Sequence, residues 1–246
     1  MSKRTDALPV ILAFEASTNQ LSVAVYADGM TRAMKMAEVA FGQAASLVPL
    51  AVTALAEADV DFAMISHVAA GRGPGSFTGL RVSLAAAKGV CLAHDLPGHG
   101  ISGLEALAYS YGDEDGDLPI LCLADTRRDN VYAQFFAADM TPQGGIFEAQ
   151  IEQLPFLVPP ALGQEAILLA GNGRQAAAAA FIGAGRQVRL ASARMISADQ
   201  GVDDISVNAG MIARLAAHHL ARGKISPLTP LYLADPRLGP KKKASA

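Results

Sequence analysis

The second half of the chain repeats the order of strands, turns and helices found in the first half. In each half an apolar run ends in an acid, a second run begins six residues later, and a later strand leads through a glycine turn into a helix. The corresponding positions are Glu15 and Asp125, Leu21 and Val131, and the turns Gly71–Gly73 and Gly171–Gly173. Because internal repeats decide architecture, we predict two tandem α/β units. Each would contain three meandering strands, a helix, a fourth strand, a glycine turn and a second helix.

An acidic, polar break at Asp113–Asp117 separates the two halves. We therefore expect one domain at residues 1–111 and a second at 112–246, with the last helix, about residues 206–222, packing back on the first. Hydrophobic residues make up 51% of the chain, which is enough for a sizeable core. We expect a cytoplasmic protein with no membrane partner, because Met1–Pro9 is polar and no uncharged apolar segment reaches about 18 residues.

The first half begins with predicted strands at residues 10–14, 21–26 and 31–39. The next apolar segment, residues 44–56, carries no charge and predicts a helix that lies in a core or in an interface. Pro49 lies inside this segment and should kink the helix or split it at Val48, because an interior proline costs about 3 kcal/mol.

The most glycine-rich segment, Gly71–Arg81, lies between a predicted strand at residues 68–71 and a predicted helix at residues 77–93. Ser76 or Thr78 can cap that helix by accepting a backbone N–H bond. A glycine loop at a helix start can cradle a phosphate, or it can form a corner where two backbone segments pack closely. Both alternatives stay open at this point. The residues assigned to the loop are Gly73, Gly75, Ser76, Thr78, Gly79 and Arg81.

Gly73, Gly75 and Gly79 also match a loose dinucleotide-binding fingerprint. That fingerprint belongs to the first strand–turn–helix of a parallel βαβ unit, with an acid about 20 residues later. Here the loop follows a meander and a helix, so the match is weak.

Further elements are predicted between and after these segments. Ser102, with Glu105 three residues later, predicts a capped helix at residues 102–111, whereas residues 97–101 are ambiguous. The second half has predicted strands at 118–124, 131–137, 146–151 and 167–170 and a predicted helix at 175–182.

Few residues in the chain have the spacing of a catalytic or metal centre. None of the five histidines forms an i, i+4 pair on a helix, and Cys91 and Cys122 are expected to be buried, reduced thiols. Glu15, Thr18 and Asp125 could line a cleft between the halves and hold a metal ion or water. Alternatively, nearby backbone N–H groups satisfy each acid. The tail Lys241–Lys243 is predicted to be solvated, with contact to RNA as the lesser alternative.

Several segments together resemble the TsaB (YeaZ) family. The hallmark is Gly73–Arg81, with the sequence GPGSFTGLR. Similar segments are Ile11–Val25, Ser102–Ala108, Asp125–Tyr132 and Pro230–Leu233, so the resemblance covers nearly the whole chain.

The resemblance implies the actin-like ATPase (ASKHA) class of α/β fold, in which two tandem ribonuclease-H-like units have mixed sheets flanked by helices. It also implies a non-catalytic subunit that helps to add threonylcarbamoyl to the adenosine beside the tRNA anticodon. The implied partners are a TsaD-type transferase, a TsaE-type ATPase and, through the complex, tRNA. ATP would be used by the complex, no cofactor would be firmly bound to this chain, and protease activity is not expected.

The chain departs from the family pattern in two places. Glu15-Ala16-Ser17-Thr18 stands where the family usually has an aspartate followed by Thr-Ser-Thr, and the longer acid argues against nucleotide binding in the cleft. Gly42–Ser46 replaces a charged His-Ser-Glu segment, which is expected to change partner contacts at the edge of an interface.

The apolar helices predicted at residues 44–56 and 77–93 suggest how partners would bind. Packed together, they would leave a second apolar surface, and a specific interface there would bury about 1,600 Å². The predicted contacts are Leu47, Leu50, Ala51, Ala54, Leu84, Ala87 and Val90. Without a partner, the same face would form a homodimer. The alternative is that both helices are plain core; Ala87→Glu distinguishes the two, because it would unfold a core helix but only abolish binding at an interface.

Three functions therefore stay open. The first is a partner subunit for tRNA modification, and the second is a free-standing nucleotide-dependent enzyme that uses Glu15, Thr18 and Asp125. The third is a dinucleotide-binding oxidoreductase that uses Gly73–Gly79.

Overall fold

The computed structural model describes residues 8–18, 20–38, 43–112, 117–126, 130–192 and 206–233. The strands of the first half are β1 (Ile11–Glu15), β2 (Gln20–Ala27), β3 (Met30–Glu38), β4 (His67–Gly71) and β5 (Gly98–Ile101). Its helices are α1 (Gln43–Ala58), the short 3-10 helix η1 (Phe62–Met64), α2 (Phe77–His94) and α3 (Gly103–Tyr111).

The second half has strands β6 (Ile120–Asp125), β7 (Asn130–Phe136), β8 (Phe147–Gln150), β9 (Ile167–Gly171) and β10 (Val188–Leu190). Its helices are the 3-10 helices η2 (Ile151–Leu157) and η3 (Pro160–Leu162) and the α-helix α4 (Arg174–Gly183). The last helix is α5 (Ala209–Ala221).

The two sheets share one topology. Their strand orders are β3-β2-β1-β4-β5 and, in the same sense, β8-β7-β6-β9-β10. In each sheet the first three strands are antiparallel neighbours, and the remaining two run parallel to the first strand of their unit. This is a duplicated ribonuclease-H-like unit, so the predicted fold class, two tandem α/β units of the actin-like kind, is confirmed.

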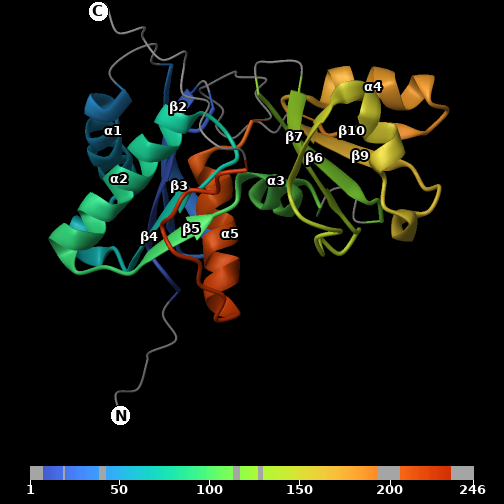
Figure 1. Cartoon of the computed structure of the whole chain (residues 1–246). Coiled ribbons are helices and arrows are strands. Elements are labelled where there is room, and N and C mark those ends of the chain that lie inside the picture. Colours follow the sequence, from blue (N-terminus) through green and yellow to red (C-terminus); the bar gives the residue numbers. More distant parts are fainter. Residues whose placement is uncertain are drawn as a thin grey trace, which may run out of the picture.

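Strand β1 shows why helices cover both faces of the first sheet. Ile11 and Ala13 belong to the core cluster that includes α5, whereas Leu12 and Phe14 belong to the cluster beneath α1 and α2. Successive side chains point to opposite faces of a strand, and a continuous apolar run therefore needs cover on both. Figure 1 shows α1 and α2 on one face and α5 on the other.

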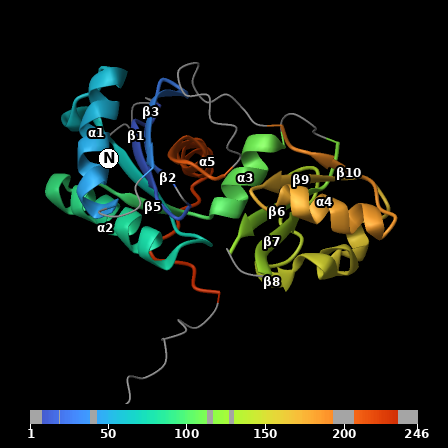
Figure 2. The same ribbon diagram turned by 90° about the horizontal axis from the view of Figure 1, so that it is seen from above.

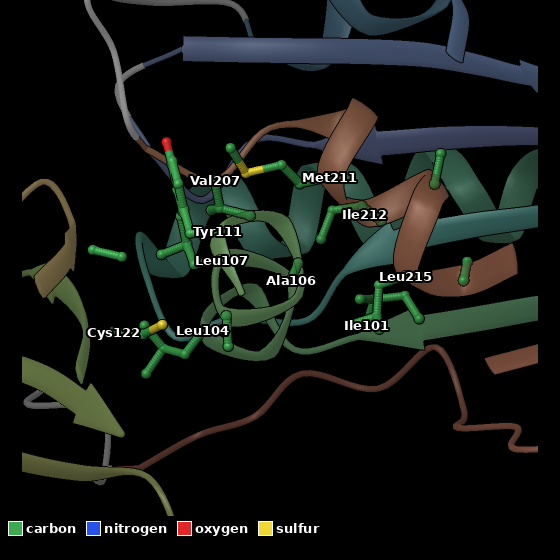
Figure 3. Close-up of a cluster of buried hydrophobic side chains, with 14 of the residues drawn as sticks. Ile101, Leu104, Ala106, Leu107, Tyr111, Cys122, Val207, Met211, Ile212 and Leu215 are labelled. Atoms are coloured by element: carbon green, nitrogen blue, oxygen red, sulfur yellow. The ribbon is translucent and has the colours of Figure 1, made fainter. Parts of the chain in front are cut away.

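Helices α3 and α5 lie between the two sheets (Figure 2). α5 packs against β1, β2 and α3, and α3 also contacts β6 and β9 of the second sheet. One buried cluster runs through this layer, and Leu104 and Leu107 of α3 lie between Ile212 of α5 and Cys122 of β6 (Figure 3). The two units therefore share a continuous apolar core.

The predicted split of the first helix at Val48 is wrong, because α1 continues through Pro49. Pro49 lies in the first half of the helix, where it leaves only the carbonyl of Ala45 without its usual donor. Both Ala45 and Pro49 are exposed, so water can reach that carbonyl.

The second unit differs from the predicted repeat after its third strand. The first unit has the sixteen-residue helix α1 there, whereas the second has only η2 and η3. Pro155 lies inside η2, and Pro159 and Pro160 follow it, which prevents a long α-helix. The short strand β10 was not predicted. No helix among the described residues combines the length and apolar character needed to cross a membrane.

Candidate functional site

The glycine loop between β4 and α2 packs against the turn that follows β1. A Cβ atom at Gly79 would lie 1.8 Å from the carbonyl oxygen of Ala16, and one at Gly75 would lie 2.6 Å from Ser17. The N–H of Ser76 donates to the carbonyl of Ser17 at 2.8 Å. The backbone of the turn after β1 therefore fills the space beside the loop. Of the two alternatives, the close-packed corner describes this loop and the phosphate cradle does not.

The start of α2 is capped as predicted. The Ser76 hydroxyl accepts a hydrogen bond from the N–H of Gly79 at 3.2 Å, while Thr78 and Arg81 are exposed. Gly73 has a φ of +102°, in the region that favours glycine. The glycines thus serve the turn and the close approach, and this approach takes the space that a dinucleotide pyrophosphate would need at Gly75 and Gly79.

Glu15, at the end of β1, is fully buried beside the same loop. Its Oε1 accepts the N–H of Ser17 at 2.5 Å, and a Cβ at Gly71 would lie 1.6 Å from its Oε2. Burial raises the pKa of the Glu15 carboxyl, although the hydrogen bonds from Ser17 oppose the rise. Oε2 has no hydrogen-bond partner among the described residues. A buried carboxyl in this environment favours its protonated form.

Glu15→Gln is expected to stabilise the protein at neutral pH, because glutamine is a neutral replacement for the protonated acid. The raised pKa of Glu15 contributes stability below the unfolded-state value of 4.5, and that contribution is lost as the pH rises through the folded-state value. The free energy of unfolding of the variant, measured with urea, should therefore exceed that of the parent by more at about pH 8 than at about pH 5. An equal difference in unfolding free energy at both pH values would contradict this account.

The three residues predicted to line a cleft, Glu15, Thr18 and Asp125, have different surroundings in the structure. Glu15 is buried against the loop, and the Thr18 hydroxyl donates to the carbonyl of Gln20. Asp125 is exposed at the end of β6, where its N–H donates to the Asn172 side chain at 2.8 Å. The described residues include no group of three that could hold a metal ion.

The structure contradicts five of the seven predicted partner contacts. These five are at most 4% exposed, because they form the core between the helices and the sheet: Leu47, Ala51, Ala54, Leu84 and Ala87. Leu50 and Val90 are half-buried at the edge of that cluster. At these five positions the alternative of plain core is correct.

The same two helices carry apolar side chains on their solvent side. Val48 and Val52 of α1 are 58% and 53% exposed, and Leu92 of α2 is 88% exposed. Ala85 and Gly89 of α2 are exposed as well. We call these five residues the outer face of α1 and α2. Small residues such as Ala85 and Gly89 permit close approach of another helix, and apolar surface of this kind often marks a protein interface.

A polar cluster that sequence reasoning missed joins α3 to the end of α5. The Glu105 carboxylate accepts a hydrogen bond from Lys224 at 2.6 Å and lies 3.2 Å from His219 Nε2. Burial raises the pKa of Glu105, but the hydrogen bonds from His219 and Lys224 outweigh it and hold the pKa at about 2. Burial, with His67 and His219 nearby, lowers the pKa of His99 to about 4. These contacts fix the start of the C-terminal segment.

Comparisons with known proteins agree with this geometry. The family model of TsaD, tRNA N6-adenosine threonylcarbamoyltransferase, matches residues 37–150. The Escherichia coli tRNA threonylcarbamoyladenosine biosynthesis protein TsaB is 30% identical over 141 residues, which cover 57% of this chain and 59% of that protein. The Haemophilus influenzae TsaB is 32% identical over 123 residues, covering 50% of this chain and 51% of its own length. The matches thus span little more than half of these relatives.

A solved structure of YeaZ from Pseudomonas aeruginosa superposes over 92% of this chain and all of its own, with a TM-score of 0.69 and 25% identity. A second Pseudomonas aeruginosa structure, described as similar to peptidase YEAZ, has a TM-score of 0.70 and 24% identity. These likenesses extend over both units of the fold.

Proposed function

Because the chain belongs to the TsaB (YeaZ) family, we propose that it is a non-catalytic partner subunit in the synthesis of threonylcarbamoyladenosine on tRNA. The names of its Escherichia coli and Haemophilus influenzae relatives assign those proteins to this biosynthesis. The match of residues 37–150 to the TsaD model relates the segment that contains α1 and α2 to a transferase of the same pathway.

The observation that carries the partner role is the apolar outer face of α1 and α2. Val48, Val52 and Leu92 are each more than half exposed, on helices whose other side is packed on the sheet. A TsaD-type protein shares the corresponding segment, so two related helix pairs can pack face to face in a pseudo-symmetric arrangement. A bundle of four helices would bury the apolar residues of both proteins.

The same face would also allow self-association when the partner is missing. Two copies of this chain would present identical outer faces, and an isologous homodimer uses one patch twice. A TsaE-type ATPase and tRNA would join through the complex, and the complex would use ATP. Glu15, packed against Gly71 and Ser17, serves the fold of this chain and takes no part in the chemistry.

The proposal is tested by mixing the chain with the TsaD-type protein of the same organism and measuring mass by light scattering after size exclusion. We expect a heterodimer that forms at the expense of any homodimer. Two separate species at concentrations well above the micromolar range would overturn the proposal.

A further inference from the structure

An exposed aromatic and cationic cluster lies where the C-terminal segment meets the start of α2. Phe77 is 41% exposed and Tyr232 is 50% exposed, and their ring centroids are 5.6 Å apart. The Arg81 guanidinium lies 3.8 Å from the centroid of the Phe77 ring, and its Nε donates to the Tyr232 hydroxyl at 3.4 Å. We call Phe77, Arg81 and Tyr232 the aromatic clamp.

Packing along the segment before Tyr232 holds the clamp in place. The N–H of Gly100 donates to the carbonyl of Ser226 at 2.9 Å, and the N–H of Leu231 donates to the carbonyl of Arg72 at 2.7 Å. Leu228 is buried, and its side chain packs so closely on Gly98 that a Cβ atom there would lie 2.4 Å from Cδ1 of Leu228. The C-terminal segment therefore passes beside the edge strand β5 (Figure 1), and the ring contact with Phe77 places Tyr232 at the start of α2. A contact group held in this way needs little ordering when a ligand binds.

The segment that carries Phe77 and Arg81 is basic, although the whole chain has a net charge of −3. Residues 62–94 contain Arg72, Arg81 and Lys88 and no acid, which gives +3. This charge favours a polyanion as the ligand of the clamp, and the exposed rings favour one with unstacked bases.

We propose that the aromatic clamp is a contact site for single-stranded RNA. An unpaired base stacks on the exposed aromatic surface, and Arg81 pairs with a phosphate; base stacking on aromatic side chains and arginine planes is how proteins usually hold single-stranded RNA. The choice of RNA over another polyanion rests on the proposed role in tRNA modification. Within that role, the chain itself touches the single-stranded part of the tRNA while its partner carries out the chemistry.

Fluorescence anisotropy of the full chain with a labelled RNA hairpin tests this site directly. The hairpin should have a single-stranded loop, and a blunt duplex of equal length serves as the competing probe. We expect the hairpin to bind more tightly than the duplex. Tyr232→Ala should weaken hairpin binding by about 5- to 100-fold, the range that follows from losing one stacking contact. Arg81→Gln, which removes the phosphate contact, should weaken hairpin binding as well. Tyr232→Phe retains the ring and should keep most of the affinity.

Matched controls separate the clamp from exposed aromatic or cationic residues in general. Phe156 on η2 is 82% exposed and Arg32 on β3 is an exposed cation, so Phe156→Ala and Arg32→Gln should leave hairpin binding unchanged. A chain that ends after Leu233 lacks Arg237 and the three terminal lysines, and its affinity should depend less steeply on salt.

The inference is overturned if the parent does not bind the hairpin, or if Tyr232→Ala and Arg81→Gln bind it as the parent does. It is also overturned if these variants lose affinity for the TsaD-type protein but not for RNA, because the clamp would then be a protein-docking surface. Failure here leaves the proposed function standing as long as the chain still forms the heterodimer, since the outer face is tested without RNA.

Discussion

A glutamate in place of Val52 is expected to abolish binding to the TsaD-type partner while the chain stays folded. Val52 is 53% exposed on α1, so in the free chain the new carboxylate remains in water. In the bundle that we propose, the same carboxylate would be buried without a partner, which costs several kcal/mol and corresponds to a loss of about 100-fold or more in affinity. Isothermal titration calorimetry with the TsaD-type protein measures the loss.

Ile182→Glu is the matched control for this substitution. Ile182 lies on α4 of the second unit and is 66% exposed, so it also places a new carboxylate on the solvent side of a helix. Partner affinity should be unchanged in this variant. If Val52→Glu bound as tightly as Ile182→Glu, the outer face of α1 and α2 would not be the interface.

Gly79→Ala is expected to have the largest effect on folding. The added Cβ would lie 1.8 Å from the carbonyl oxygen of Ala16, and neither the loop nor the turn after β1 has a flexible side chain at that point to move aside. Because both backbones must separate, we expect the free energy of unfolding to fall by about 3 to 5 kcal/mol. Urea unfolding monitored by circular dichroism gives the difference.

Gly89→Ala supplies the comparison within the same helix. A Cβ at Gly89 meets nothing within 4 Å, so alanine should be neutral or should stabilise α2 by up to about 1 kcal/mol through its better helix propensity. Equal stability of Gly79→Ala and Gly89→Ala would show that the loop does not depend on close packing against Ala16.

The fold could be predicted because each strand leaves a pattern in neighbouring residues and the second half of the chain repeats the first. The run at β1 is apolar at every position before Glu15, which requires cover on both faces, and the second half repeats the order of strands from β6 onward. The repeat predicted a helix after the third strand of the second unit, but the prolines of η2 and η3 prevent a long α-helix there. The short strand β10 has too few residues to leave a pattern.

The side of α1 that faces the sheet could not be predicted, because nearly every position of the helix is apolar. Leu47, Ala51 and Ala54 face the core, whereas Val48 and Val52, one position further along, face solvent. A helix that is apolar all round carries no period from which its buried side can be deduced. Most of the residues predicted as partner contacts therefore lie on the buried side of these helices.

Long-range contacts explain why other parts of the site were missed. Tyr232 and Arg81 are 151 residues apart in sequence, and no local pattern joins them. Glu15 was identified as an acid at the end of a strand, but sequence alone does not show that its carboxyl is buried beside Gly71. The cap at Ser76 was predictable because all of its atoms lie within one helical turn.

The most direct test of the central claim is reconstitution of the modification reaction. The mixture contains the TsaD-type and TsaE-type proteins of the same organism, tRNA, ATP and the threonylcarbamoyl-AMP precursor system, with or without this chain. Modified adenosine is then counted by mass spectrometry. We predict modification only when the chain is present, none by the chain alone, and a large loss with Val52→Glu. Equal modification in the presence and absence of the chain would contradict its role as a required partner.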